Sequence, residues 1–224
     1  MFVIRRLYNF IIRSLSRGRV PDEEEIEKPP MPFGSPAEKA GGADIEIVKD
    51  YSVTDKWHKG WSREIKDITE AVIHHTDGGG DIYTLKQWML GGEFSSSYKK
   101  GRGLFHYVID REGRIWEVGP LSRWWYHSCS GKHDRSTVGI ELIHKSGSYT
   151  DKQYESLCRL LFDYLPLSVT FRLIVGHDYN YNKYSSKTKG CPGPDFRWER
   201  LEEEMVKRNL KFVPKAKEAY EFIH

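Results

Sequence analysis

The stretch from Thr137 to Ile143, TVGIELI, decides the fold class of this chain. Val138, Ile140 and Leu142 alternate with the other residues of the stretch. Successive side chains of a β-strand point to opposite faces of a sheet. The pattern therefore predicts a strand that carries its apolar side chains on one face and Glu141 on the other.

The segments on either side of this strand predict further strands and helices. The run AVIHH at 71–75 is typical of a short buried strand, and Thr84 with Gln87 and Thr150 with Gln153 match a helix capping box. The remaining expected strands are 104–110, 115–118 and 171–175, and the expected helices follow Thr84, follow Thr150 and cover 195–208. Strands mixed with helices predict an α/β domain with a single mixed central β-sheet covered by helices.

The chain begins with a segment that differs from the domain. Residues 1–20 carry five arginines, no acidic residue and many apolar side chains, which favours a basic amphipathic segment on a membrane surface, while a tail helix packed on the body is the alternative. Arg5 and Arg6 interrupt the apolar run, so we expect no cleavable signal peptide and synthesis in the cytoplasm. Residues 21–45 are rich in proline and glutamate and predict an extended linker. The domain is expected at 46–210, and a C-terminal tail at 211–224.

Composition excludes several classes of protein. A net charge of +3 over 224 residues is too small for a typical nucleic-acid binder, so no nucleic-acid partner is expected. Three cysteines are too few for a disulfide scaffold. No run of about 18 apolar residues exists, which excludes a spanning helix. The function must therefore come from motifs in a globular domain, which we expect to be a monomer.

Polar residues that can bind a metal follow the ends of the expected strands. His74 and His75 close one strand, His177 follows another, and Cys191 lies in the loop sequence CPGP. Two imidazoles and a thiolate are good zinc ligands, and three protein ligands leave a fourth position for water. Because adjacent strand residues face opposite ways, the pattern alone does not choose between His74 and His75.

Four sequence blocks resemble a known family. They are IHHT at 73–76, FHYVIDREG at 105–113, TVGIEL at 137–142, and GHDYN at 176–180 followed by KGCPGPDF at 189–196. Over about 68–198 the chain resembles the zinc-dependent type-2 N-acetylmuramoyl-L-alanine amidases, which include phage lysozyme-type amidases, bacterial recycling amidases and animal peptidoglycan recognition proteins. The resemblance implies their fold, one Zn²⁺ ion, and hydrolysis of the amide bond between N-acetylmuramic acid and L-alanine in peptidoglycan or muropeptides.

The resemblance also assigns roles to single residues. It implies that His74, His177 and Cys191 bind zinc, which leaves His75 as a packed residue or a support for a ligand. It implies that Glu141 is the catalytic glutamate, and that Lys189 assists catalysis at the developing oxyanion. Some relatives carry a tyrosine where this chain has Phe105. We expect this difference to place the proton transfer on Glu141.

Further residues and an alternative function stay open at this point. Trp125 and His127 are candidate substrate contacts, although aromatic clusters are more often core. Asp178 could orient a ligand imidazole, but a turn residue is the favoured interpretation. The alternative function is a non-catalytic peptidoglycan-binding recognition module, against which Cys191 argues. An amidase could act on intact wall, as a phage or bacterial lysin, or on soluble muropeptides.

Overall fold

The computed structural model describes residues 45–52, 60–76, 81–90, 104–128, 130–144, 148–179 and 190–223. The expected segment 1–20, nearly all of the expected linker, and Lys189 lie outside these ranges. The strands are β1 (Ile47–Lys49), β2 (Trp61–Ser62), β3 (Glu70–His75), β4 (Tyr107–Ile109), β5 (Ile115–Glu117), β6 (Arg123–Trp124), β7 (Thr137–Leu142), β8 (Leu173–Gly176), β9 (Phe212–Ala216) and β10 (Ala219–Phe222). The helices are η1 (Ile65–Asp67), α3 (Ile82–Leu90), α4 (Gly131–Asp134), α5 (Asp151–Arg159), its continuation η3 (Leu160–Tyr164) and η4 (Leu165–Leu167), and α7 (Trp198–Lys207).

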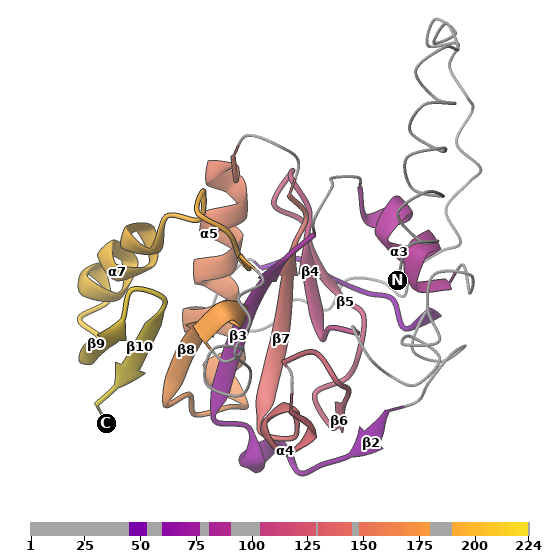
Figure 1. The fold of residues 1–224 in the computed structure, drawn as a ribbon, viewed down its shortest axis with the longest axis horizontal. Helices are drawn as coiled ribbons and strands as arrows, with labels where there is room; N and C mark the ends of the chain where they lie inside the picture. The colour runs from indigo at the N-terminus through magenta and orange to yellow at the C-terminus, as the bar shows by residue number, and fades with distance from the viewer. Residues whose placement is uncertain are drawn as a thin grey trace, which may run out of the picture. The chain divides into compact units, whose positions relative to one another are not determined.

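Eight of these strands form one mixed sheet, in the order β1-β5-β4-β7-β3-β8-β10-β9 (Figure 1). The central strands β4, β7, β3 and β8 run parallel to their neighbours in that group. The pairs β4–β5, β8–β10 and β10–β9 are antiparallel. The expected single mixed sheet is confirmed, and β2 and β6 form a separate two-stranded sheet.

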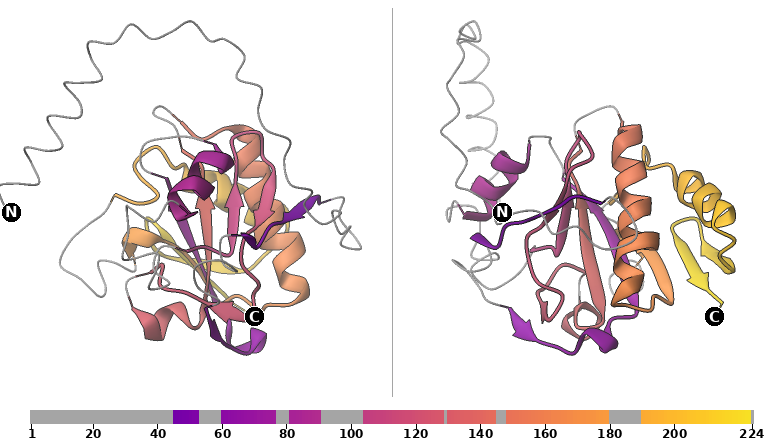
Figure 2. Two further views of the ribbon diagram at one scale, coloured as in Figure 1. Left: turned by 90° about the vertical axis from the view of Figure 1, so that its right-hand side faces the viewer. Right: turned by 180° about the vertical axis from the view of Figure 1, so that it is seen from behind.

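Helices cover both faces of the sheet. Leu157 of α5 and Leu201 of α7 belong to the larger core cluster, which packs against the Ile73 and Ile140 side of the sheet. Leu85 of α3 belongs to a second cluster with Val108 of β4. In Figure 1, α7 with the β9–β10 hairpin lies on the left and α3 on the right, and Figure 2 shows the same arrangement from behind.

The helix starts test the capping predictions. At α5 the box is confirmed, because the Gln153 backbone N–H donates to Thr150 Oγ1 at 3.2 Å and the Thr150 N–H donates to Gln153 Oε1 at 3.0 Å. At α3 the prediction is wrong by one turn. There the Asp81 carboxylate accepts the Thr84 backbone N–H at 2.7 Å, and the helix already begins at Ile82.

The sheet extends past the boundary expected at residue 210. The segment 211–224, expected as a tail, contributes β9 and β10, and β10 pairs with β8 through Tyr220 and Ile174. Tyr220 is 4% exposed and belongs to the larger core cluster. Within the part of the chain that the structure describes, no helix combines the length and apolar character needed to cross a membrane.

Candidate metal centre

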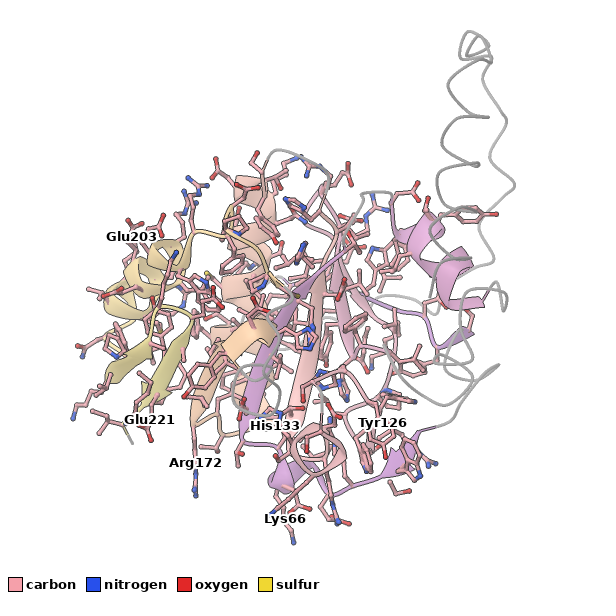
Figure 3. The ribbon with its side chains drawn as sticks, in the orientation of Figure 1. Lys66, Tyr126, His133, Arg172, Glu203 and Glu221 are labelled. Carbon is pink, nitrogen blue, oxygen red and sulfur yellow. The ribbon has the colours of Figure 1, made fainter. Side chains whose placement is uncertain are left out.

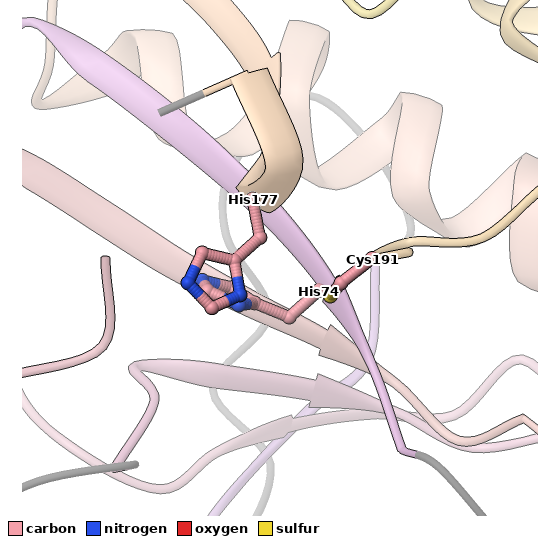
Figure 4. Close-up of side chains that lie close together, drawn as sticks. All are labelled: His74, His177 and Cys191. Atoms are coloured by element: carbon pink, nitrogen blue, oxygen red, sulfur yellow. The ribbon is translucent and has the colours of Figure 1, made fainter. Parts of the chain in front are cut away.

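Three side chains from distant parts of the chain converge on one point (Figure 4). His74 belongs to β3, His177 directly follows β8, and Cys191 lies in the chain that leads to α7. One potential ligand atom of each lies within 4.8 Å of the others, and all three residues are buried. The ring centroids of His74 and His177 are 4.4 Å apart.

Strand register explains why the two histidines meet. β3 and β8 are parallel neighbours, with Ile73 paired to Gly176. His74 and His177 are the next residue along each strand, so they emerge side by side at the same edge of the sheet. The register also settles which histidine of the pair lies with His177, because His75 points to the opposite face.

Hydrogen bonds join Asp178, the residue after His177, to Gly190 and Cys191. The Asp178 backbone N–H donates to the Cys191 carbonyl at 2.8 Å. The Asp178 carboxylate in turn accepts the Gly190 backbone N–H at 2.7 Å. Asp178 therefore joins the chain beside His177 to the chain beside Cys191.

The residue after the cysteine is also held from two sides. The Tyr149 hydroxyl donates a buried hydrogen bond to the Pro192 carbonyl. Gly176 lies against the Pro192 ring, and a Cβ at that position would be 2.8 Å from Pro192 Cδ. The absence of a side chain at Gly176 thus lets Pro192, and with it Cys191, approach β8.

Glu141 lies beside His74, since the two residues are partners in the register of β3 and β7. Its side chain is buried at 3% exposure, and among the described residues its Oε2 atom has no hydrogen-bond partner. Burial raises the pKa of this carboxyl well above its ordinary value. A buried carboxyl with an unsatisfied oxygen beside His74 is a suitable proton acceptor and donor.

The donor set fits a metal ion. Two imidazoles and a thiolate match the ligand preferences of zinc. Among the described residues three protein donors converge, and three protein ligands would leave a fourth coordination position open to water or substrate. The triad is therefore consistent with a metal site.

Two neighbouring aromatic residues agree with the sequence interpretation. The ring centroid of Phe105 lies 5.1 Å from that of His74, so this position borders the site with a side chain that carries no hydroxyl. His75 packs against His144, with ring centroids 5.3 Å apart. The structure thus places His75 in packing contacts away from the triad.

The expected substrate contacts need a correction. Trp125 is 0% exposed and packs in the second core cluster with Trp116. The His127 side chain is also fully buried, and its Nδ1 lies 3.0 Å from His74 Nε2. Neither side chain is exposed to a substrate in this structure, because Trp125 lies in the core and His127 is buried against His74.

Sequence reasoning missed two residues that surround His127. Thr137 Oγ1 lies 2.9 Å from His127 Nε2. A Cβ at Gly139 would be 2.9 Å from His127 Nδ1. Both residues share a strand face with Glu141, so the period-two pattern that predicted the strand contains the signal that could have found them.

The fold and the buried triad define an α/β domain with a candidate metal site. A family model described as N-acetylmuramoyl-L-alanine amidase (Amidase_2) matches residues 64–194, which is more than half of the chain. The chain therefore belongs to the N-acetylmuramoyl-L-alanine amidase family. No curated protein sequence matches it significantly.

Solved structures agree on the fold. N-acetylmuramoyl-L-alanine amidase LysC from Clostridium intestinale URNW is similar with a TM-score of 0.50 and 19% identity, over 73% of this chain and 97% of that chain. The recognition protein PGRP-SA from Apis mellifera gives 0.51 and 16%, over 70% and 94%. The endolysin of Thermus scotoductus MAT2119 bacteriophage Ph2119 gives 0.50 and 15%, over 71% and 98%. These likenesses confirm the amidase and peptidoglycan-recognition-protein type of fold.

Proposed function

We propose that the protein is a zinc-dependent N-acetylmuramoyl-L-alanine amidase that hydrolyses the amide bond between N-acetylmuramic acid and L-alanine in peptidoglycan or muropeptides. The observation that carries the proposal is the buried group of His74, His177 and Cys191, in a chain of the amidase family. His74, His177 and Cys191 would hold one Zn²⁺ ion.

The chemistry of the site supports this reaction. When bound, zinc lowers the pKa of a water molecule toward 7 and polarises a carbonyl group. Glu141 lies next to His74 in the sheet. Its carboxylate can accept the proton of the attacking water and return it to the departing amine, which is worth about 10²–10⁴-fold in rate.

Phe105 and Lys189 bear on the remaining steps of the proposed reaction. Phe105 borders His74 and offers no hydroxyl for proton transfer, which leaves that task to Glu141. Lys189 precedes the Gly190–Cys191 pair in the sequence. We propose that its positive charge stabilises the tetrahedral oxyanion, an electrostatic contribution that often dominates such reactions.

The test is the release of stem peptides, detected by mass spectrometry, from purified sacculi and from soluble muropeptides. We expect the zinc-loaded protein to release peptides that begin with L-alanine from at least one of the two, and EDTA to abolish the release. Cys191→Ala should be inactive, whereas Cys158→Ala, a matched control at a cysteine buried among the helices, should keep its activity.

The outcomes separate the alternatives. Binding to sacculi without peptide release by the zinc-loaded protein would favour the non-catalytic recognition module. Full activity of Cys191→Ala would contradict the proposed metal centre. A preference for sacculi would indicate a lysin, and a preference for soluble muropeptides a recycling enzyme.

A further inference from the structure

A chain of buried hydrogen bonds runs from the metal centre to α4. His74 Nε2 lies 3.0 Å from His127 Nδ1, and His127 Nε2 lies 2.9 Å from Thr137 Oγ1. The Thr137 hydroxyl donates in turn to the Asp134 backbone carbonyl at 3.2 Å. The first contact joins residues 53 positions apart, and the other two join residues 10 and 3 positions apart; none of them was predicted.

The chain has a direction, which follows from its last member. A carbonyl oxygen only accepts, so the Thr137 hydroxyl proton points toward Asp134 and the hydroxyl oxygen is left to accept from His127 Nε2–H. With one proton on the His127 ring, its Nδ1 is then an acceptor and receives the proton of His74 Nε2–H. His74 is left with its lone pair on Nδ1. If His127 Nδ1–H instead donated to His74 Nε2, His74 would carry its own proton on Nδ1. Neither ring nitrogen of His74 would then be available to a metal.

We propose that His127 is a positioning residue that holds the His74 proton on Nε2 and thereby presents Nδ1 of His74 to the metal ion. The inference rests on the proposed metal centre. Metal-binding histidines commonly donate their other ring N–H to a fixed acceptor, which sets the tautomer and the ring orientation. Here the acceptor is a second imidazole, itself fixed by a hydroxyl group.

The surroundings hold the His127 ring in place. Its backbone N–H and that of Ser128 donate to the Asp134 carboxylate at 3.1 and 2.7 Å. Gly139 leaves the space that the ring fills, since a Cβ there would approach the ring to 2.9 Å. The ring is therefore fixed from its backbone and from the sheet below it.

α4, which supplies the last acceptor, is itself fastened to the start of β3. His133 Nε2 lies 2.8 Å from a carboxylate oxygen of Glu70, and Figure 3 shows His133 at this end of the sheet. The His133 ring also contacts the Ser128 hydroxyl at 2.6 Å. The Asp134 carbonyl is thus a fixed end for the chain of hydrogen bonds.

The experiment combines zinc affinity, measured by competition with a chelator, with ¹⁵N NMR of the histidine rings in the zinc-loaded full chain. We expect His74 and His127 both to carry their proton on Nε2. Thr137→Val keeps the shape of the side chain but removes the acceptor, and it should weaken zinc binding by about 10–100-fold. Thr137→Ser keeps the hydroxyl and should bind zinc as the unmodified protein does.

Two further variants address His127 directly. His127→Phe preserves the ring but offers no acceptor, so zinc affinity should fall by about 10–100-fold. His127→Asn retains an acceptor near the Nδ1 position and should recover part of that loss. Thermal unfolding of each metal-free variant shows whether it folds. If His127→Phe does not fold, the zinc affinity of Thr137→Val tests the inference.

The results separate this inference from the proposed function. A proton on Nδ1 of His74, or unchanged zinc affinity in a folded Thr137→Val variant, would overturn the inference. A protein that binds zinc with the expected tautomers yet releases no peptide would overturn the proposed activity alone. A protein that binds no zinc would overturn both.

Discussion

Replacing Gly176 by alanine tests how tightly the cysteine is placed. An added Cβ would lie 2.8 Å from Pro192 Cδ, which is 0.6 Å less than the 3.4 Å at which ordinary contact begins. The same Cβ would lie 3.0 Å from Trp198 Cζ2, so it has no space on that side either. Pro192 must therefore retreat by about 0.6 Å and carry Cys191 with it, while zinc ligands tolerate a displacement of only about 0.2 Å.

The expected loss follows from the cost of overpacking. Inserting a methyl group into a packed site costs about 1–3 kcal/mol. The metal-free protein can relax around the alanine, but zinc requires Cys191 in its original place. The strain then appears in the zinc-bound state and weakens zinc affinity by about 5- to 150-fold.

The assay is chelator competition for zinc, together with thermal unfolding of the metal-free protein. Ile109→Val is the control, because Ile109 is fully buried in the larger core cluster with residues of α5 and α7, and this change costs about 0.5–1.5 kcal/mol of stability. It should leave zinc affinity unchanged. If Gly176→Ala binds zinc as tightly as the unmodified protein, or if the control weakens zinc equally, the reasoning about Pro192 is refuted.

Three further changes test other parts of the structure. In metal-free Glu141→Gln we expect higher stability at neutral pH, because burial raises the carboxyl pKa above its ordinary 4.5. The folded protein then holds this proton more tightly than the unfolded chain, so the contribution of Glu141 to stability is fully present below pH 4.5 and is lost as the pH rises. The gap in unfolding temperature between variant and unmodified protein should widen with pH, and parallel curves would contradict the burial argument. Gly139→Ala should push the His127 ring away from His74 and lower zinc affinity by about 10–100-fold in chelator competition. An unchanged zinc affinity would show that the His127 ring has room to move. Thr150→Ala should cost about 1 kcal/mol in denaturant unfolding by removing the α5 cap with little effect on zinc affinity, whereas unchanged stability would show that the cap contributes nothing.

The buried strands were the most predictable part of the fold. β7 follows its apolar alternation from Thr137 to Leu142, and α5 begins at the capping box that its sequence contains. Both signals are local, because strand periodicity and capping depend on residues only a few positions apart.

The C-terminal hairpin was not predictable in the same way. β9 contains Pro214 and lies at the edge of the sheet, where its residues are mostly exposed and a missing N–H is tolerated. Such a strand shows no apolar alternation. Only the pairing of β10 with β8, a contact between distant segments, places the hairpin in the sheet.

The candidate site also combines residues that local sequence signals predict with residues that only long-range contacts place. The chemistry of His177 and Cys191 could be recognised from residue type and from family resemblance. The choice between His74 and His75 required a strand face that register defines. The position of His127 required a contact across 53 residues of sequence, which no local pattern encodes.

The hydrogen bonds between Asp178 and the Gly190–Cys191 segment have a consequence for how the sequence of this chain can vary. The backbone N–H and the carboxylate of Asp178, at the His177 end of the connection, bind Cys191 and Gly190 at its other end. Because these bonds join the two ends directly, we expect the spacing of His177 and Cys191 not to depend on residues 180–188. We therefore expect changes of length and composition within residues 180–188 that keep Lys189 to leave the affinity for zinc intact.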